Sequence, residues 1–151
     1  PIEQAIPDAL RVIEGAYAML FMTETQLVAA QDPRAFHPLA LGKLDEGWVV
    51  ASETCALDVC GAEFVREIEP GEMLVIDTEG LHSQTFMQPS SRSICSFEYI
   101  YFARPDSEID GISVHNVRKE MGRQICREVP TEADVVIGVP DSGLAAAIGF
   151  A

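Results

Sequence analysis

The sequence predicts an α+β protein in two parts, an antiparallel meander followed by the beginning of an α/β domain. Residues 16–87 carry short apolar runs separated by turn signals, with little helical periodicity. The tract Pro89–Ser93 then has the composition of a loop. After it, the pattern changes to helix, strand and helix. We therefore expect a boundary between residues 104 and 112.

The first part should open with an amphipathic helix over residues 2–14, which Gly15 ends. A short helix through Leu57 and Val59 is expected within the meander, with Ser52–Thr54 as its cap. Strands are predicted at residues 16–22, 27–30, 39–44, 48–51, 64–68, 73–76 and 81–87.

The second part should contain a helical segment over residues 95–103 and a longer helix over residues 113–128. The continuous apolar run Val135–Val139 then predicts a fully buried strand, which Pro140 stops. A final helix over residues 144–151 has no polar face, so it needs cover on every side, and no chain remains in this sequence to supply that cover.

The turn Asp141–Gly143 is the main candidate for a binding site. A strand that ends in a small polar turn and leads into a helix presents free backbone N–H groups and the positive end of the helix dipole. This arrangement suits a phosphate or another anion. The alternative is an ordinary strand–turn–helix in which Ser142 caps the helix and no ligand binds.

Charge limits the partners that the protein can have. The chain has 24 acidic and 10 basic residues, for a formal net charge of −14. Such a field repels nucleic acids and anionic membrane surfaces, so we expect neither as a partner. The longest apolar runs are too short for a membrane span, and no signal peptide is visible.

The cysteines and histidines show no pattern of a metal or catalytic cluster. Cys55, Cys60 and Cys126 are expected to be buried as small hydrophobic residues, and the low cysteine content predicts a cytosolic protein with reduced thiols. His82 and His115 are expected on a surface or on a helix face. Both ends of the sequence look interrupted, so we expect an internal segment of a longer protein.

Three tracts together make the sequence recognisable. They are Val50–Asp58 (VASETCALD), Cys95–Ser107 (CSFEYIYFARPDS) and Val139–Gly143 (VPDSG). The chain closely resembles the amidophosphoribosyltransferase family over nearly its whole length. It departs from the family at Ala35, where glycine is usual, and at His37, where arginine is usual.

The resemblance implies the fold and the reaction. Residues 1–105 would be the rear half of an N-terminal-nucleophile (αββα) glutaminase sandwich, and residues 106–151 the start of a phosphoribosyltransferase domain. Such an enzyme hydrolyses glutamine and uses the ammonia to displace pyrophosphate from phosphoribosylpyrophosphate. The product, 5-phosphoribosylamine, is made in the first committed step of de novo purine synthesis. A cytoplasmic homo-oligomer, a dimer or a tetramer, is implied.

The resemblance also implies site residues. Asp141, Ser142 and Gly143 match the loop that meets the pyrophosphate, and Ser142 matches a position associated with Mg²⁺. Cys95 matches the first cysteine ligand of the [4Fe–4S] cluster in a subgroup of the family, whose other ligands would follow Ala151. The nucleophilic cysteine would precede Pro1, which has no thiol. No catalytic residue is therefore expected within this sequence, and the fragment should be inactive alone.

Two alternatives remain open at this point. The first is a non-catalytic homologue that keeps the scaffold without the chemistry. The second is another glutamine amidotransferase of the N-terminal-nucleophile type, such as the glucosamine-phosphate-forming kind. The tract Val139–Gly143 argues against the second, because a sugar-isomerase-type domain would follow the glutaminase in that enzyme.

Overall fold

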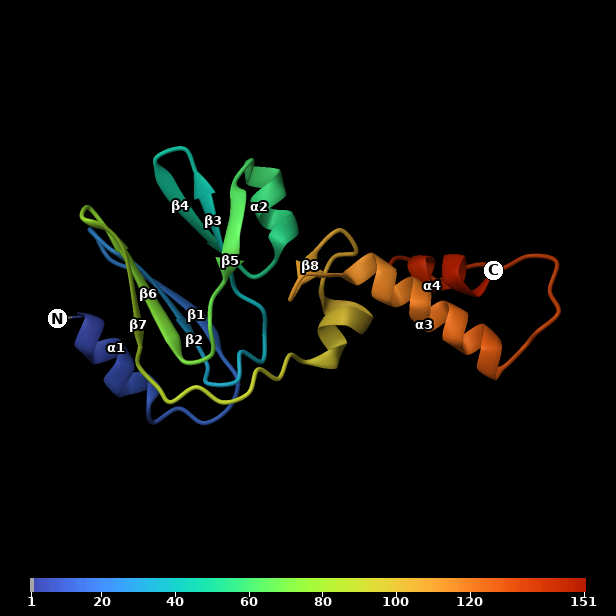
Figure 1. Cartoon of the computed structure of the whole chain (residues 1–151), viewed down its shortest axis with the longest axis horizontal. Coiled ribbons are helices and arrows are strands. Elements are labelled where there is room, and N and C mark those ends of the chain that lie inside the picture. Colours follow the sequence, from blue (N-terminus) through green and yellow to red (C-terminus); the bar gives the residue numbers. More distant parts are fainter. Residues whose placement is uncertain (1) are drawn as a thin grey trace. The chain divides into compact units, whose positions relative to one another are not determined.

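The computed structural model describes residues 2–151, so Pro1 lies outside the described residues. The chain forms two compact units. The first contains the residues up to Ser52 together with Ala56–Cys95, and the second contains Glu53–Cys55 and Ser96–Ala151. Helices and strands are mixed along the chain (Figure 1), which confirms the α+β class.

Two antiparallel sheets form the first unit. The four-stranded sheet has the order β1-β2-β6-β7, and the three-stranded sheet has the order β4-β3-β5. All the predicted strands of the meander are present, with bounds that differ by at most two residues. The strands are β1 (Ala18–Met22), β2 (Leu27–Gln31), β3 (Ala40–Leu44), β4 (Gly47–Ala51), β5 (Glu63–Glu67), β6 (Glu72–Asp77) and β7 (Gly80–Thr85).

Helix α1 (Ile2–Leu10) covers one face of the four-stranded sheet. Its Ile6 and Leu10 pack with residues of β2 and β6, including Val28 and Met73. The helix is shorter than predicted, because the residues that follow it bury no apolar face: Val12 is 81% exposed.

The other face of this sheet packs against the three-stranded sheet. The shared core joins Ala29 and Leu74 of one sheet to Leu41 of the other. Helix α2 (Thr54–Cys60) inserts Leu57 beside β3, where a side chain on Gly42 would lie 2.9 Å from Leu57 Cδ2. The central strands β2 and β6 are apolar on both faces, because one face packs against α1 and the other against the second sheet.

The second unit is mainly helical. Its elements are the π-helical turn η1 (Glu98–Phe102), strands β8 (Glu108–Ile109) and β9 (Ile112–Ser113), and helices α3 (Val114–Glu128) and α4 (Gly143–Phe150). Asp110 and Gly111 both have positive φ, which suits the tight turn between β8 and β9. Ser113 caps α3 by accepting a hydrogen bond from the Asn116 backbone.

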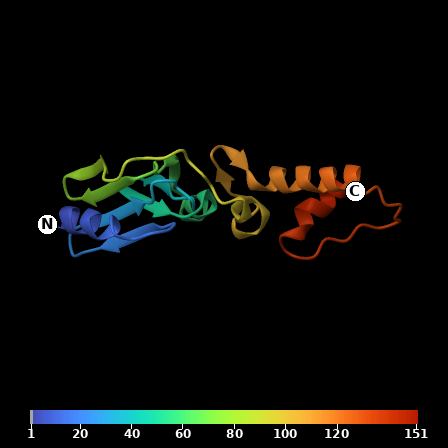
Figure 2. The ribbon, with the colours of Figure 1, turned by 90° about the horizontal axis from the view of Figure 1, so that it is seen from below.

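Helices α3 and α4 lie side by side (Figure 2), and their backbones approach each other closely. A side chain on Gly122 would collide with the carbonyl group of Ala146, and one on Gly149 would collide with that of Lys119. The cover that this apolar helix was expected to need is incomplete within the described residues. Leu144 and Ile148 are exposed, because α3 covers only one side of this helix.

The predicted strand Val135–Val139 is also absent. This segment is irregular, and Val135, Ile137 and Val139 are 71%, 85% and 79% exposed. A buried parallel strand needs hydrogen-bonding neighbours. Within the described part of the second unit, the only strands are β8 and β9, which pair with each other. Among residues 2–151, no helix has both the length and the apolar character needed to cross a membrane.

Candidate functional site

The loop before α4 is open to solvent, as an anion site requires. Asp141 is exposed, and Ser142 and Gly143 are half-buried. The peptide bond between Pro140 and Asp141 is cis. The Gly143 N–H donates to the carbonyl oxygen of Val139 at 3.0 Å. Ser142 occupies the N-cap position, but its hydroxyl makes no capping hydrogen bond. The capping role considered for this side chain is therefore not observed.

A cavity of about 750 Å³ in the second unit adjoins this loop. We call it the α4 cavity. Its apolar lining comes mainly from η1 and α4, while α3 contributes basic groups. Its ionisable and hydroxyl groups belong to Tyr101, Arg104, His115, Arg118, Asp141 and Ser142. The fold thus brings the predicted loop residues Asp141 and Ser142 together with basic groups far away in the sequence.

Arg118 is the most buried charged group of this cavity, with 3% of its surface exposed. Its Nε donates to the Tyr99 carbonyl at 2.6 Å, and its Nη2 donates to the Ala103 carbonyl at 2.7 Å. Burial lowers the pKa of Arg118 from its usual value, and the charge of Glu53 partly opposes this shift. The side chain therefore ties α3 to both ends of η1.

A second network fixes the turn between η1 and β8. Glu53 Oε2 accepts hydrogen bonds from the Arg104 backbone N–H at 2.6 Å and from Ser107 Oγ at 2.8 Å. Thr54 Oγ1 accepts a hydrogen bond from the Glu108 N–H at 2.8 Å. We call these five residues the Glu53 clasp. It joins two of the tracts that make the sequence recognisable, and all of it belongs to the second unit.

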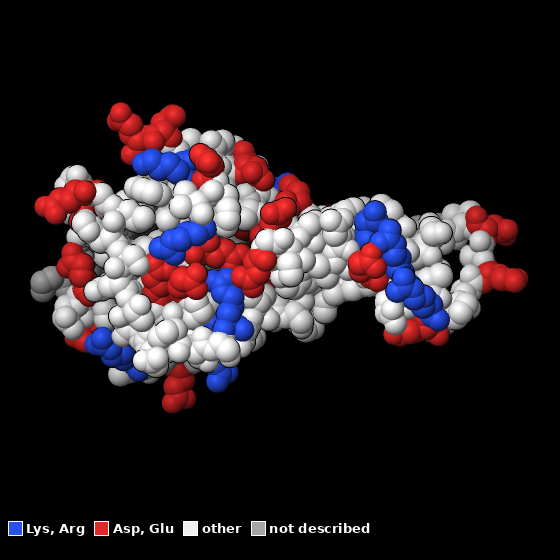
Figure 3. All heavy atoms as spheres, in the orientation of Figure 1, with Lys and Arg blue, Asp and Glu red and all other residues white. Residues whose placement is uncertain are grey.

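The guanidinium of Arg104 is held beside the cavity by Asp106. Nε and Oδ1 are 3.0 Å apart, and Nη2 and Oδ2 are 2.7 Å apart. The hydrogen bonds and the charge of Asp106 raise the pKa of Arg104. Figure 3 shows further basic side chains gathered along α3, whereas acidic side chains are spread over much of the first unit. Basic groups therefore lie beside the loop, although Asp106 and Glu120 pair with two of them.

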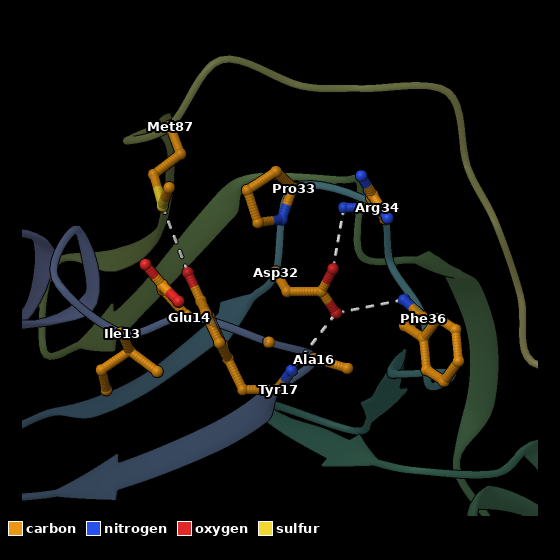
Figure 4. Close-up of a pocket in the computed structure, with 10 residues that line it drawn as sticks. Ile13, Glu14, Ala16, Tyr17, Asp32, Pro33, Arg34, Phe36 and Met87 are labelled. Atoms are coloured by element: carbon orange, nitrogen blue, oxygen red, sulfur yellow. Dashed lines mark hydrogen bonds between the residues drawn. The ribbon is translucent and has the colours of Figure 1, made fainter.

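The first unit has its own cavity, of about 490 Å³, around Asp32 (Figure 4). The Asp32 carboxylate is buried and accepts hydrogen bonds from the backbone N–H groups of Tyr17, Arg34 and Phe36 at 3.4, 2.8 and 3.0 Å. Burial is the main cause that raises the pKa of Tyr17, and the charge of Asp32 adds to the shift. The Tyr17 hydroxyl lies 3.2 Å from Met87 Sδ. Because Asp32 serves the backbone of its own turn, we assign it a structural role.

The two departures from the family lie in this turn. Ala35 has a φ of 47° in a left-handed conformation that glycine adopts more easily. His37 contributes its backbone, because its carbonyl accepts a hydrogen bond from Gln31 Nε2 at 2.9 Å. The ring of His37 packs edge-on against Phe36, with 5.3 Å between the ring centroids.

The four cysteines are free thiols, but they differ in exposure. Cys55 is buried, Cys95 and Cys126 are half-buried, and Cys60 is exposed. The prediction of burial was wrong for Cys60, because it lies at the end of α2, beyond the face that carries Leu57. Residues 2–151 contain no group of three or more His, Cys, Asp or Glu side chains that could hold a metal ion. The thiol of Cys95 therefore does not form a four-thiolate site with other described residues.

Sequence reasoning missed Glu53 and Arg118. The tract Ser52–Thr54 was interpreted as a helix cap and as part of a tract that carries the resemblance, and neither indicates a partner 54 residues away. Arg118 lies in a helix with several other charged residues, and its sequence position does not reveal that it is buried.

Comparisons with known proteins place these features in context. No protein-family model matches the chain. It is 54% identical over 150 residues to amidophosphoribosyltransferase from Bacillus subtilis. The matched region covers 99% of this chain and 32% of the relative. It is 56% identical over 150 residues to that of Mycobacterium tuberculosis, covering 99% of this chain and 28% of the relative.

Solved structures give the same result. The B. subtilis glutamine phosphoribosylpyrophosphate amidotransferase complexed with ADP and GMP matches with a TM-score of 0.94 and 53% identity, over 99% of this chain and 33% of that one. A structure described as the allosteric regulatory enzyme of purine biosynthesis matches with a TM-score of 0.95. The chain spans about a third of the length of the relatives that it matches.

Proposed function

We infer from its membership of the amidophosphoribosyltransferase family that this chain is part of an enzyme making 5-phosphoribosylamine from phosphoribosylpyrophosphate and glutamine. That reaction is the first committed step of de novo purine synthesis. The main support is the match to solved structures over 99% of the chain at 53% identity. A non-catalytic homologue and another type of glutamine amidotransferase are less favoured, because these relatives carry the amidophosphoribosyltransferase name.

We assign residues 1–105 to the glutaminase and residues 106–151 to the start of the phosphoribosyltransferase domain. The two packed antiparallel sheets with helical cover support an N-terminal-nucleophile sandwich for the glutaminase part. The helical second unit, with its open loop before α4, supports the transferase assignment. The chain spans about a third of the length of these relatives, so we expect these residues alone to carry out neither half-reaction.

The loop Asp141–Gly143 is the proposed binding site for the diphosphate of phosphoribosylpyrophosphate. The N-terminal end of α4 favours negative charge, and the free hydroxyl of Ser142 offers an oxygen ligand. Asp141 and Ser142 provide the hard oxygen donors that fit Mg²⁺, and a bound Mg²⁺ would neutralise charge on the departing diphosphate. Arg104 and Arg118, which also line the α4 cavity, add positive charge near the same loop.

Cys95 is proposed as one ligand of a [4Fe–4S] cluster in the parent enzyme. Because the described residues do not supply the other ligands, such a cluster requires thiolates from elsewhere. Iron analysis and visible absorbance of the parent test this proposal, with Cys95→Ser expected to abolish both signals. A parent that is colourless and free of iron when purified without oxygen would rule out the cluster.

We further propose that the parent is a cytoplasmic homo-oligomer.

The function itself is tested by assaying the parent enzyme with glutamine, phosphoribosylpyrophosphate and Mg²⁺. We expect glutamate, pyrophosphate and phosphoribosylamine to form in equal amounts. Ammonia should replace glutamine in the transferase reaction. Glutamine hydrolysis with no consumption of phosphoribosylpyrophosphate under either condition would contradict the proposal and favour another amidotransferase. The absence of both reactions would favour a non-catalytic homologue.

A further inference from the structure

We propose that Glu53 is a positioning residue for the use of phosphoribosylpyrophosphate, although its sequence position falls within the part assigned to the glutaminase. This inference rests on the proposed function. Glu53–Cys55 belongs to the second unit, while the residues on both sides of this segment belong to the first unit. Glu53 should therefore affect the transferase half-reaction.

The contacts of Glu53 are specific. A single carboxylate oxygen, Oε2, accepts the backbone N–H of Arg104 at 2.6 Å and the hydroxyl of Ser107 at 2.8 Å. Ser107 is fully buried. Hydrogen bonds to an ionised carboxylate are stronger than those between neutral groups, especially when they are shielded from water. Glu53 thus holds the turn at both of its ends, through the backbone of Arg104 and the hydroxyl of Ser107.

The same turn forms part of the wall of the α4 cavity. Arg104 and Pro105 both line the cavity, together with Asp141 and Ser142. The turn is also tied to the start of α3, because the Ser107 carbonyl accepts the Val114 N–H at 3.0 Å. The Pro105 carbonyl likewise accepts the N–H of His115, another lining residue, at 3.0 Å.

Weakening the hydrogen bonds of Glu53 should therefore displace Arg104 and Pro105, which line the cavity beside the proposed diphosphate site. Glu53 does not line the cavity itself, so it acts through Arg104, Pro105 and His115. The competing explanation is that Glu53 only stabilises the fold, as a residue next to the first turn of α2. The two explanations differ in what they predict for the two half-reactions.

The experiment uses the full-length parent enzyme with Glu53→Gln. Glutamine keeps the size of the side chain but removes its charge. Its neutral amide oxygen accepts hydrogen bonds from Arg104 and Ser107 more weakly than the carboxylate oxygen does. The KM for phosphoribosylpyrophosphate is measured with ammonia as the nitrogen source, and glutamine hydrolysis is measured separately. We expect the KM to rise about threefold to tenfold, the range that the loss of one such hydrogen bond gives. The rate of glutamine hydrolysis should stay within twofold of the unmodified enzyme.

Two further variants keep the test decisive. Ser107→Ala removes one donor of the clasp and should raise the same KM by a smaller factor, and the double variant should show less than the product of the two effects. Glu120→Gln is the matched control, since Glu120 lies in the same unit and pairs with Arg123 on the surface. It should change neither half-reaction.

An unchanged KM in both Glu53→Gln and Ser107→Ala would overturn the inference, as would an equal loss of both half-reactions. Should Glu53→Gln fail to fold, Ser107→Ala decides by the same criterion. These outcomes differ from a failure of the proposed function, in which the unmodified parent would not use phosphoribosylpyrophosphate at all.

Discussion

The guanidinium of Arg66 forms a two-bond ion pair with the buried carboxylate of Glu72. Arg66 Nη1 lies 2.8 Å from Glu72 Oε2, and Nη2 lies 2.6 Å from Oε1. The same carboxylate accepts hydrogen bonds from Ser83 Oγ at 2.5 Å and from the Glu69 N–H at 2.7 Å. Glu72 therefore links β5, β6 and β7, and four donors satisfy its charge.

We predict that Glu72→Gln destabilises the first unit by about 2–4 kcal/mol, because it leaves the Arg66 charge without its partner. Thermal unfolding measures the loss. The matched control is Glu63→Gln, because Glu63 is exposed on β5. Equal stability of the two variants would show that the Arg66–Glu72 pair contributes nothing.

The pH dependence of stability gives a second test of Glu72. Burial raises the pKa of this carboxyl, but the hydrogen bonds from Arg66, Ser83 and the Glu69 backbone outweigh burial and hold the pKa below the usual 4.5. The folded state therefore binds the proton less readily than the unfolded state does. The contribution of Glu72 is complete above about pH 4.5 and is lost as the pH falls through the folded-state value. Unfolding from pH 7 to pH 3 should show a smaller acid loss in Glu72→Gln; an identical acid loss in both proteins would contradict this.

Gly122→Ala should displace α4 from α3. The added methyl group would meet the carbonyl of Ala146, which is backbone and cannot rotate away. We expect a loss of about 2 kcal/mol or more and faster hydrogen exchange throughout α4. Gln124→Ala, at an exposed position two residues later, is the control and should have little effect. Normal protection of α4 in Gly122→Ala would mean that the two helices do not pack as closely as described.

Ala35→Gly should be better tolerated than Ala40→Gly. Both alanines are buried, with 1% and 3% exposure, but only Ala35 has the left-handed φ that penalises a side chain. We expect the cost to be at least about 1 kcal/mol smaller at position 35. Comparison of the two unfolding free energies tests this, and a larger cost at Ala35 would contradict the assigned backbone conformation.

Thiol labelling should follow the exposure of the cysteines. A maleimide or disulfide reagent should modify Cys60 first and Cys55 last in the native protein. Mass spectrometry of partly labelled protein identifies the order, and denatured protein, in which all four thiols react, is the control. Rapid labelling of Cys55 would show that the contact region around Glu53 opens in solution.

Local patterns made much of this fold predictable. The individual strands were correctly identified, because each is a short apolar run and three pairs of them, such as β1 and β2, are joined by short turns. The simple meander was wrong, because β2 pairs with β6 and β5 pairs with β3 across long stretches of sequence. The strand predicted at Val135–Val139 failed because its apolar composition says nothing about whether pairing strands are available. The turn Asp110–Gly111 carried a hairpin signal that was overlooked.

The site was only partly predictable. Asp141, Ser142 and Gly143 were proposed because a helix start and a small polar turn are visible in the sequence, and their binding role stays a prediction. Glu53 and Arg118 were not found, since their partners come from other elements and their burial depends on tertiary packing. A resemblance can identify such tracts, but only the coordinates show that Glu53 contacts Ser107.

The role of the loop before α4 is tested most directly by the affinity of the parent enzyme for phosphoribosylpyrophosphate. Calorimetric titration with Mg²⁺ present should show at least about tenfold weaker binding in Gly143→Val, because a branched side chain there obstructs the approach of the diphosphate to the start of α4. Glutamine hydrolysis by the same variant should be unchanged. Unaltered affinity in Gly143→Val would contradict the assignment of this loop to the diphosphate.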